Sequence, residues 1–192
     1  MYKFLDRILK KTVVEIYNLF QEYRAMSFDE LNIVSSVQQL YRELEEINLR
    51  AYREIANHYY NSEPHGDESL HDLWLEGVLS SPSPVMKYSY DSEVVRKRDR
   101  LMEALIATKG SVLEYDTAMR NWTQMTGWFA VEVADAALQQ ARIDDGLEFV
   151  MWVSERDDKV CSRCKKLDGN VYPTQTVPPK PHPNCRCYTV RV

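Results

Sequence analysis

The chain has 192 residues, 44% of them hydrophobic and 28% charged, and a formal net charge of −5. This length suffices for one domain, or one domain with an extension, to bury a core without disulfides. The acidic balance excludes a protein that coats nucleic acid along its whole surface. No apolar stretch is long enough to span a bilayer, so we expect no membrane partner.

The charge is unevenly distributed along the chain. Residues 151–192 contain eight Lys/Arg and four Asp/Glu, whereas residues 1–150 contain sixteen Lys/Arg and twenty-five Asp/Glu. An acidic body with a basic C-terminal end predicts two surfaces with different partners. An uneven distribution of merely solvated charge remains the alternative.

Apolar residues recur at three- and four-residue steps in the first 145 residues, which predicts helices. The first covers residues 3–23. Ser27 and Glu30 form a capping-box sequence, which predicts a second helix that continues to about Tyr60 without any Gly or Pro. The run NSEPHG then ends it.

Three shorter helical predictions follow. One covers about Ser69–Leu79 and ends at the proline-containing loop SSPSP. The next begins near Ser92 and ends around Lys109–Gly110, and Ser111 caps the last, which reaches Arg142 with a bend at Gly127.

The C-terminal segment changes character. FVMWVSE, from Phe149, is rich in β-branched and aromatic residues and predicts a strand, with CRCYTVRV as its partner. The predicted fold class is therefore mainly α with a small C-terminal α+β module: long amphipathic helices, then a β-hairpin-like unit of the zinc-knuckle type. We expect a helical arm over residues 1–110 and a compact module over 111–192.

All four cysteines and one of the four histidines lie close together in this module. Two pairs, Cys-x-x-Cys and His-x-x-Cys, have the spacing of structural zinc ligands, and a fifth donor follows on the same strand face. The predicted metal ligands are Cys161, Cys164, His182, Cys185 and Cys187. Four ligands suffice, and the sequence leaves open whether Cys185 or Cys187 is the fourth.

Disulfides and free thiols are the alternatives to a bound metal. The N-terminus lacks the apolar segment and cleavage site of a signal peptide, so we expect cytosolic synthesis, where thiols stay reduced. That favours a metal. Neither HExxH nor a deaminase signature is present, which favours a structural zinc over a catalytic one. Asp157, Asp158 and Asp168 beside the first cysteine pair are explained by turns, the last ahead of a left-handed Gly169.

A family resemblance rests on these same residues. A strand bearing Trp152 leads to Asp157-x-x-x-Cys161-x-x-Cys164, a Leu-Asp-Gly turn and the closing run HPNCRC. This order resembles the C-terminal module of tailed-phage head morphogenesis proteins, the Mu F-like minor head proteins. The close match covers residues 149–192. A looser match begins at about Ser111 and includes Asn121 and Trp122.

The resemblance implies a minor head protein that is recruited through the portal vertex during prohead assembly and assists DNA packaging or ejection without being an enzyme. The implied partners are the portal protein, other head proteins (scaffold or major capsid) and phage DNA. The implied location is the host cytoplasm during assembly and then the virion head, near the portal vertex. The competing hypotheses are a small zinc-dependent enzyme or toxin that acts on nucleic acid, and a pure DNA-binding zinc module.

Two sets of residues are candidates for contact with these partners. Lys and Arg supply the sequence-independent part of DNA binding, and the module carries six beside its cysteines: Arg156, Lys159, Arg163, Lys165, Lys166 and Arg186. Aromatic residues of the arm are candidates for docking on another protein, although core packing is the more frequent role for such residues: Tyr41, Tyr52, Tyr59, Tyr60 and Trp74. Three further histidines, His58, His65 and His71, are near one another in sequence; a second metal there is an alternative to no specific role.

Overall fold

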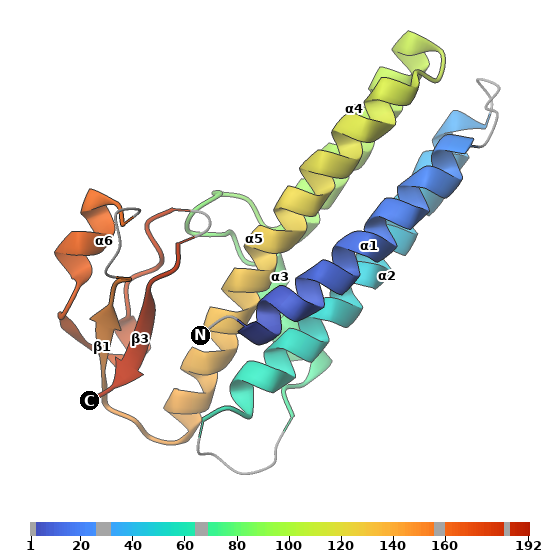
Figure 1. The fold of residues 1–192 in the computed structure, drawn as a ribbon. Helices are drawn as coiled ribbons and strands as arrows, with labels where there is room; N and C mark the ends of the chain where they lie inside the picture. Colours follow the sequence, from blue (N-terminus) through green and yellow to red (C-terminus); the bar gives the residue numbers. More distant parts are fainter. Residues whose placement is uncertain (1–2, 26–31, 64–68, 156–159, 183–184) are drawn as a thin grey trace.

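The structure is a computed structural model of the chain, and it describes residues 3–25, 32–63, 69–155, 160–182 and 185–192. The predicted fold class is confirmed: long helices are followed by a small C-terminal α+β module (Figure 1). The sheet of that module has three antiparallel strands instead of the two that a hairpin would need. Ser27 and Glu30 of the predicted capping box lie outside the described residues.

The helical part consists of two long hairpins and one short helix. Helices α1 (Lys3–Ala25) and α2 (Ile33–Tyr60) lie side by side, as do α4 (Tyr90–Thr108) and α5 (Val112–Asp144), with the short α3 (Asp72–Ser80) beside α4 and α5 (Figure 1). Among them, α5 packs on both α1 and α2. The result is an elongated bundle along which amphipathic helices bury one face each.

Several predicted helix ends shift in the structure. α4 begins at Tyr90 because Ser89 is its N-cap, with the Ser89 hydroxyl accepting a hydrogen bond of 3.2 Å from the Ser92 amide. α3 begins at Asp72, later than predicted, and α5 continues to Asp144. Ser111 occupies the N-cap position of α5, but its side chain makes no cap bond there, and the helix runs unbroken through the predicted bend.

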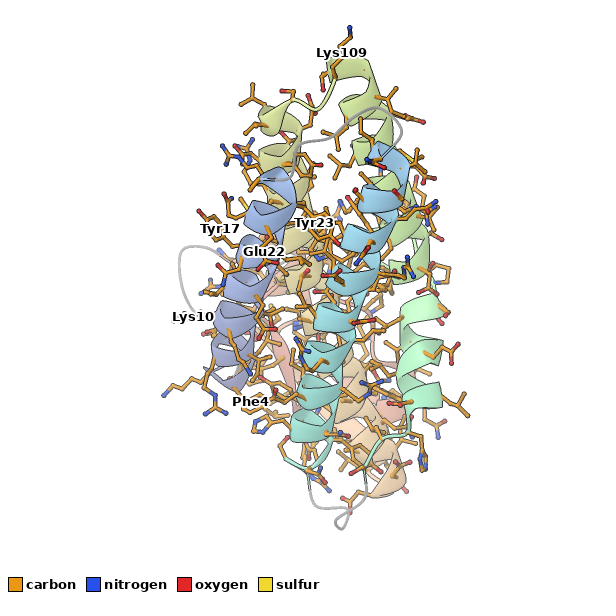
Figure 2. All side chains as sticks on the ribbon, turned by 90° about the vertical axis from the view of Figure 1, so that its right-hand side faces the viewer. Phe4, Lys10, Tyr17, Glu22, Tyr23 and Lys109 are labelled. Carbon is orange, nitrogen blue, oxygen red and sulfur yellow. The ribbon has the colours of Figure 1, made fainter. Side chains whose placement is uncertain are left out.

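The core of the bundle is aromatic. Tyr41 and Trp122 meet edge to face with ring centroids 5.2 Å apart, and Tyr90 meets Tyr52 and Phe129 in the same way at 5.6 and 5.3 Å. Edge-to-face pairs of this kind add to the free energy gained by burying the rings. The outer face of α1 is different, because Tyr17 and Lys10 point to solvent while Tyr23 points between α1 and α2 (Figure 2).

The aromatic residues predicted to contact a partner lie in this core. Tyr41, Tyr52, Tyr59 and Tyr60 are all buried, and Trp74 is partly buried against the same cluster. For the four tyrosines the structure therefore confirms core packing, the more frequent of the two roles, and excludes contact with a partner. The sequence pattern could not decide this, because an aromatic stripe has the same spacing whether it faces a neighbouring helix or a partner.

The division predicted near Gly110 falls at the turn between α4 and α5, where Lys109 adopts a left-handed conformation at the tip of the bundle (Figure 2). The buried core does not divide at that point. One cluster of buried apolar residues runs from Leu5 of α1 to Ala141 of α5, and a second, separate cluster surrounds Trp152 and three of the cysteines. In packing terms α5 belongs to the helical part, and the smaller core begins after it.

The module is built on the strand predicted from Phe149. β1 (Phe149–Val153) is central, and the sheet order is β2-β1-β3, with β3 (Tyr188–Arg191) the predicted partner and β2 (Val171–Pro173) unpredicted. α6 (Ser162–Leu167) connects β1 to β2, and a 3-10 turn, η1 (Thr174–Thr176), follows. In Figure 1 the module lies beside the C-terminal end of α5, far from the α4–α5 turn.

Ion pairs connect the module to the bundle. Arg142 of α5 is 5% exposed; it donates to the carboxylate of Glu63 at 2.7 Å and to both the hydroxyl and the carbonyl oxygen of Thr189 in β3. Arg191 pairs with the same Glu63 at 3.1 Å and also with Asp145. A buried guanidinium without such partners would be strongly destabilising, so these contacts fix where β3 sits against α2 and α5.

A buried polar network crosses the bundle core and generates a stability prediction. Asn48 and Thr126 are fully buried; the Asn48 amide donates to the Tyr90 hydroxyl at 3.1 Å and its oxygen accepts from the Thr126 hydroxyl at 3.0 Å. Removing the Asn48 side chain leaves the Tyr90 hydroxyl without a hydrogen-bond partner among the described residues in a desolvated site, whereas the Thr126 hydroxyl keeps its 3.0 Å bond to the Trp122 carbonyl oxygen.

We therefore expect Asn48→Ala to lower the free energy of unfolding by about 2–3 kcal/mol, from the orphaned hydroxyl and the small cavity together. Chemical denaturation measures this. Glu46→Ala, at an exposed position of the same helix, is the matched control and should change stability by no more than about 0.5 kcal/mol. Equal effects of the two substitutions would contradict a structural role for the network.

Candidate metal centre

The first cysteine pair is arranged by the start of α6. Cys161 is the N-cap residue in extended conformation, and its sulfur accepts a hydrogen bond from the Cys164 amide at 3.4 Å. One helical turn then returns Cys164 to the same side, so the two sulfurs lie 3.4 Å apart. The Cys-x-x-Cys spacing and the helix start together bring the pair to one point.

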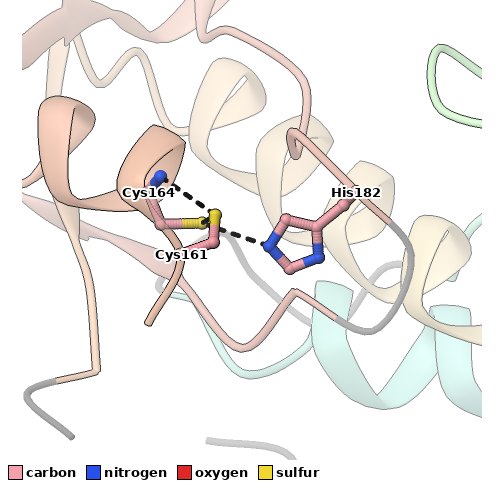
Figure 3. A group of neighbouring side chains, drawn as sticks. All are labelled: Cys161, Cys164 and His182. Carbon is pink, nitrogen blue, oxygen red and sulfur yellow. Dashed lines mark hydrogen bonds between the residues drawn. The ribbon is translucent and has the colours of Figure 1, made fainter. Parts of the chain in front are cut away.

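The second pair reaches the cluster from the segment that precedes β3. The Cys164 sulfur lies 3.5 Å from Nε2 of His182 and 3.5 Å from the sulfur of Cys185. Figure 3 shows His182 facing Cys161 and Cys164 across the site. Two groups of three donors result, Cys161–Cys164–His182 and Cys164–Cys185–Cys187, and within each group the donor atoms lie within 4.8 Å of one another.

These separations match those around a metal. Sulfurs bound at about 2.3 Å to one tetrahedral zinc lie about 3.8 Å apart, and a sulfur and an imidazole nitrogen about 3.5 Å apart. All four cysteines are free thiols, and a sulfur separation of 3.4 Å far exceeds the disulfide bond length of about 2.05 Å. The cluster of Cys161, Cys164, His182, Cys185 and Cys187 can thus bind a metal ion, as predicted.

Ser154 connects the strand to the cluster, and sequence reasoning assigned it no role. Its hydroxyl donates to the Cys164 carbonyl at 2.8 Å and accepts from the Cys187 thiol at 3.5 Å. The only signal was alternation, since Ser154 shares a face of the extended segment with the buried Trp152. Asp168 accepts from the Ser154 amide at 2.7 Å, and Gly169 has the predicted left-handed conformation, φ +77°.

The local environment lowers the pKa of one thiol of the cluster and raises the pKa of two others. The amide of Cys164 donates to the Cys161 sulfur and lowers the pKa of Cys161 to about 7. Burial raises the pKa of Cys164 well above its ordinary value and also raises that of Cys185. Cys161, at the partly exposed rim of the cluster, is therefore the thiol that ionises most readily.

The predicted DNA-contact residues divide into two groups. Arg163, Lys165 and Lys166 are exposed on α6, and Arg186 is exposed between the two buried cysteines that precede β3. Arg156 and Lys159 lie outside the described residues. Lys165 and Lys166 are in the last turn of α6, where cations also favour the helix dipole, so a structural contribution accompanies any role in binding.

The other histidines do not form a second cluster in the described part of the chain. His58 stacks on Phe4 with ring centroids 3.5 Å apart, His71 is the N-cap residue of α3, and His65 is not among the described residues. Both donor groups found within the described ranges belong to the C-terminal module.

Comparisons of the chain with protein-family models, with curated proteins and with solved structures gave no match. Among the described helices, none combines the length and apolar character needed to cross a bilayer.

The thiol pKa values predict how metal-free, reduced protein reacts. Cys161 should be alkylated first, at a rate that rises through about pH 7 because its lowered pKa makes the thiolate predominate above that pH. Cys164 and Cys185 should require more alkaline conditions. Iodoacetamide labelling across a pH series, read by peptide mass spectrometry, measures the rates. Cys161→Ser should remove the fast phase alone; four equal rates would contradict the assignment.

Proposed function

We propose that the chain is a minor head protein of a tailed phage, which associates with the portal vertex during prohead assembly and assists DNA packaging or ejection without enzymatic activity. The observation that carries the proposal is the construction of the C-terminal module. Of the residues behind the resemblance that the structure describes, Trp152, Cys164, Cys185 and Cys187 form one small buried core, and Cys161 packs against it. The donor atoms of the Cys-x-x-Cys and His-x-x-Cys pairs converge there. A motif whose parts meet in space is more specific than the same motif read along a sequence.

The helical bundle supports this proposal by offering a second, separate surface. The described contacts of the module lie along the C-terminal half of α5 and at Glu63, so the part of the bundle toward the α4–α5 turn stays clear of it (Figure 1). Apolar side chains are exposed near the far end, Ile106 on α4 and Val112 and Leu113 on α5. Together with Val14 and Tyr17 of α1, they replace the buried tyrosines as candidates for contact with the portal protein or with a scaffold or major capsid protein.

The module contributes a structural zinc in this proposal, held by Cys161, Cys164, His182 and Cys185. Cys185 is the preferred fourth ligand because its sulfur lies 3.5 Å from that of Cys164, whereas the Cys187 thiol donates a hydrogen bond to Ser154. Four Cys and His ligands in two pairs beside a buried core are typical of a closed structural zinc site. The exposed cations of α6 beside it suit contact with DNA phosphates, a binding that added salt should weaken.

The ligand assignment is tested by two matched substitutions. Protein purified under reducing conditions should contain about one zinc per chain by elemental analysis, because four converging donors bind one ion. Cys185→Ser should lose most of it and melt at a lower temperature, whereas Cys187→Ser should keep it. Both cysteines are 3% exposed, so each is the steric control for the other.

Metal removal gives the complementary result. Chelator or mild acid should lower the melting temperature of wild-type protein, since the ligands must be deprotonated to hold the ion. Reduced protein that contains no metal and melts identically with and without chelator would exclude the zinc. The reverse pattern, in which only Cys187→Ser loses metal, would move the fourth ligand to Cys187.

The head-protein proposal is tested by sedimentation. A lysate that produces particles is separated on a gradient, and the chain should travel with heads and portal in low, fixed amount; particles assembled without portal protein are the control and should lack it. If the chain stayed wholly at the top of the gradient, the proposal would fail. Nucleic-acid cleavage by the metal-loaded protein would then be assayed, as the enzyme alternative requires.

A further inference from the structure

The outer face of α1 carries an exposed stripe in which apolar side chains follow cations. Residues at three- and four-residue steps share one face of a helix, and the cations of the stripe are Lys3, Arg7, Lys10 and Lys11. Val14 and Tyr17 continue it at 58% and 49% exposure, and Figure 2 shows Lys10 and Tyr17 on this face. None of the four cations forms an ion pair with another described residue. Asp6 is the one acidic residue among positions 3–14, so the face is positive.

A groove beside α3 offers an apolar surface on another side of the bundle. Its volume is about 590 Å³. The apolar part of its wall includes Leu73, Trp74, Val78, Pro82, Pro84 and Val85. Leu73 is 79% exposed, and an exposed apolar surface with a polar rim is typical of a contact site for another chain.

The charge of this groove is opposite to that of the α1 stripe. Four carboxylates belong to it, Glu132 and Asp135 in its wall and Asp72 and Glu76 next to lining residues of α3. Arg53 balances Asp72 at 2.6 Å, and Lys180 balances Asp135 at 2.8 Å. Glu76 and Glu132 form no ion pair within the described part of the chain. The groove therefore keeps two carboxylates that cations of a partner can neutralise.

Gly77 leaves the α3 side of the groove open. A Cβ added at this residue would meet no heavy atom within 4 Å, so an incoming side chain can reach the helix backbone there. Glycine inside a helix is less favourable than alanine, and no contact among the described residues requires it at this position. A larger side chain introduced at Gly77 would fill the groove without a clash inside its own chain.

The positive stripe and the acidic groove are placed so that two copies of the chain can meet. In Figure 2, Lys10 and Tyr17 lie on one side of the bundle and α3 on the other. α1 packs on α2 and α5, whereas α3 packs on α2, α4 and α5. At 1.5 Å per residue, Lys10–Tyr17 spans about 10 Å and the nine residues of α3 about 13 Å, so the two surfaces are similar in length.

We propose that the chain binds a second copy of itself, with the α1 stripe of one copy against the α3 groove of the next. Val14 and Tyr17 pack in the apolar groove, and Lys10 and Lys11 face its unpaired carboxylates. A second copy is the favoured occupant because this chain itself carries a surface with the matching charge and exposed apolar side chains. The contact joins two different faces, so a pair of copies keeps one free face of each kind. The apolar residues at the α4–α5 turn remain available for a portal or capsid partner.

Sedimentation velocity of the purified, reduced full chain tests the association. The average mass should rise with protein concentration, and added salt should oppose that rise because it screens the charges across the contact. A single species of one chain at all concentrations up to about 100 μM would overturn the proposal and leave the groove to a different basic partner.

Substitutions on each face locate the contact. Lys10→Glu/Lys11→Glu and Glu76→Lys should each weaken the association by about tenfold, because they place like charges opposite one another. Gly77→Leu should weaken it at least as much by filling the groove, without lowering the melting temperature, since leucine favours a helix more than glycine does. Lys109→Glu/Arg120→Glu makes the same charge change as the α1 variant at exposed positions elsewhere. This control should change the association by less than about twofold.

Mixing two variants tests whether the two faces meet each other. In a mixture of the Lys10→Glu/Lys11→Glu chain with the Glu76→Lys chain, the reversed charges face one another. The mixture should therefore associate at least about threefold more strongly than either variant alone. A mixture that behaves as its separate components would overturn the pairing of α1 with α3. An association that survives the substitutions on both faces would do the same.

Discussion

Helix α5 packs closely against α1, α2 and α4 and carries the module at its C-terminal end. Ala130, Val133, Ala134, Ala137 and Ala141 have no exposed surface, and their small side chains let neighbouring helices approach the α5 backbone closely. Earlier in the same helix, Trp122 and Phe129 fill the wider space with edge-to-face aromatic contacts. One helix of 33 residues thus organises the bundle and, at its C-terminal end, carries the module.

The position of the module follows from the cost of burying charge. Arg142, near the end of α5, donates hydrogen bonds to Glu63 and Thr189. A buried guanidinium without such partners would destabilise the folded state, because its desolvation would not be compensated. Glu63 lies just after the end of α2 and Thr189 in β3, so the single side chain of Arg142 connects three segments. Within the bundle, buried apolar packing is joined by the hydrogen bonds of Asn48, whereas ion pairs of Arg142 and Arg191 connect the module to it.

The roles proposed for a head protein use two separate places on the molecule. The metal centre has its own small core around Trp152, which lets a bound ion stabilise the module without altering the bundle. The exposed apolar residues at the α4–α5 turn offer a separate surface for a protein partner. The elongated bundle keeps these two places apart (Figure 1).

Local patterns in the sequence predicted most of the elements. Periodicity predicted the long helices and alternation predicted β1 and β3. The spacing within the Cys161–Cys164 and His182–Cys185 pairs, with Cys187 beyond them, predicted a cluster of donors that could hold a metal, because each pair lies on a tight turn. β2 was not predicted, because a strand of three residues is too short for its alternation of side chains to be recognised in the sequence. Tertiary packing determined which face of each helix is buried. It buried Tyr41, placed Ser154 beside Cys187 and enclosed Arg142. These contacts depend on how distant segments pack against one another, so no local sequence pattern predicts them.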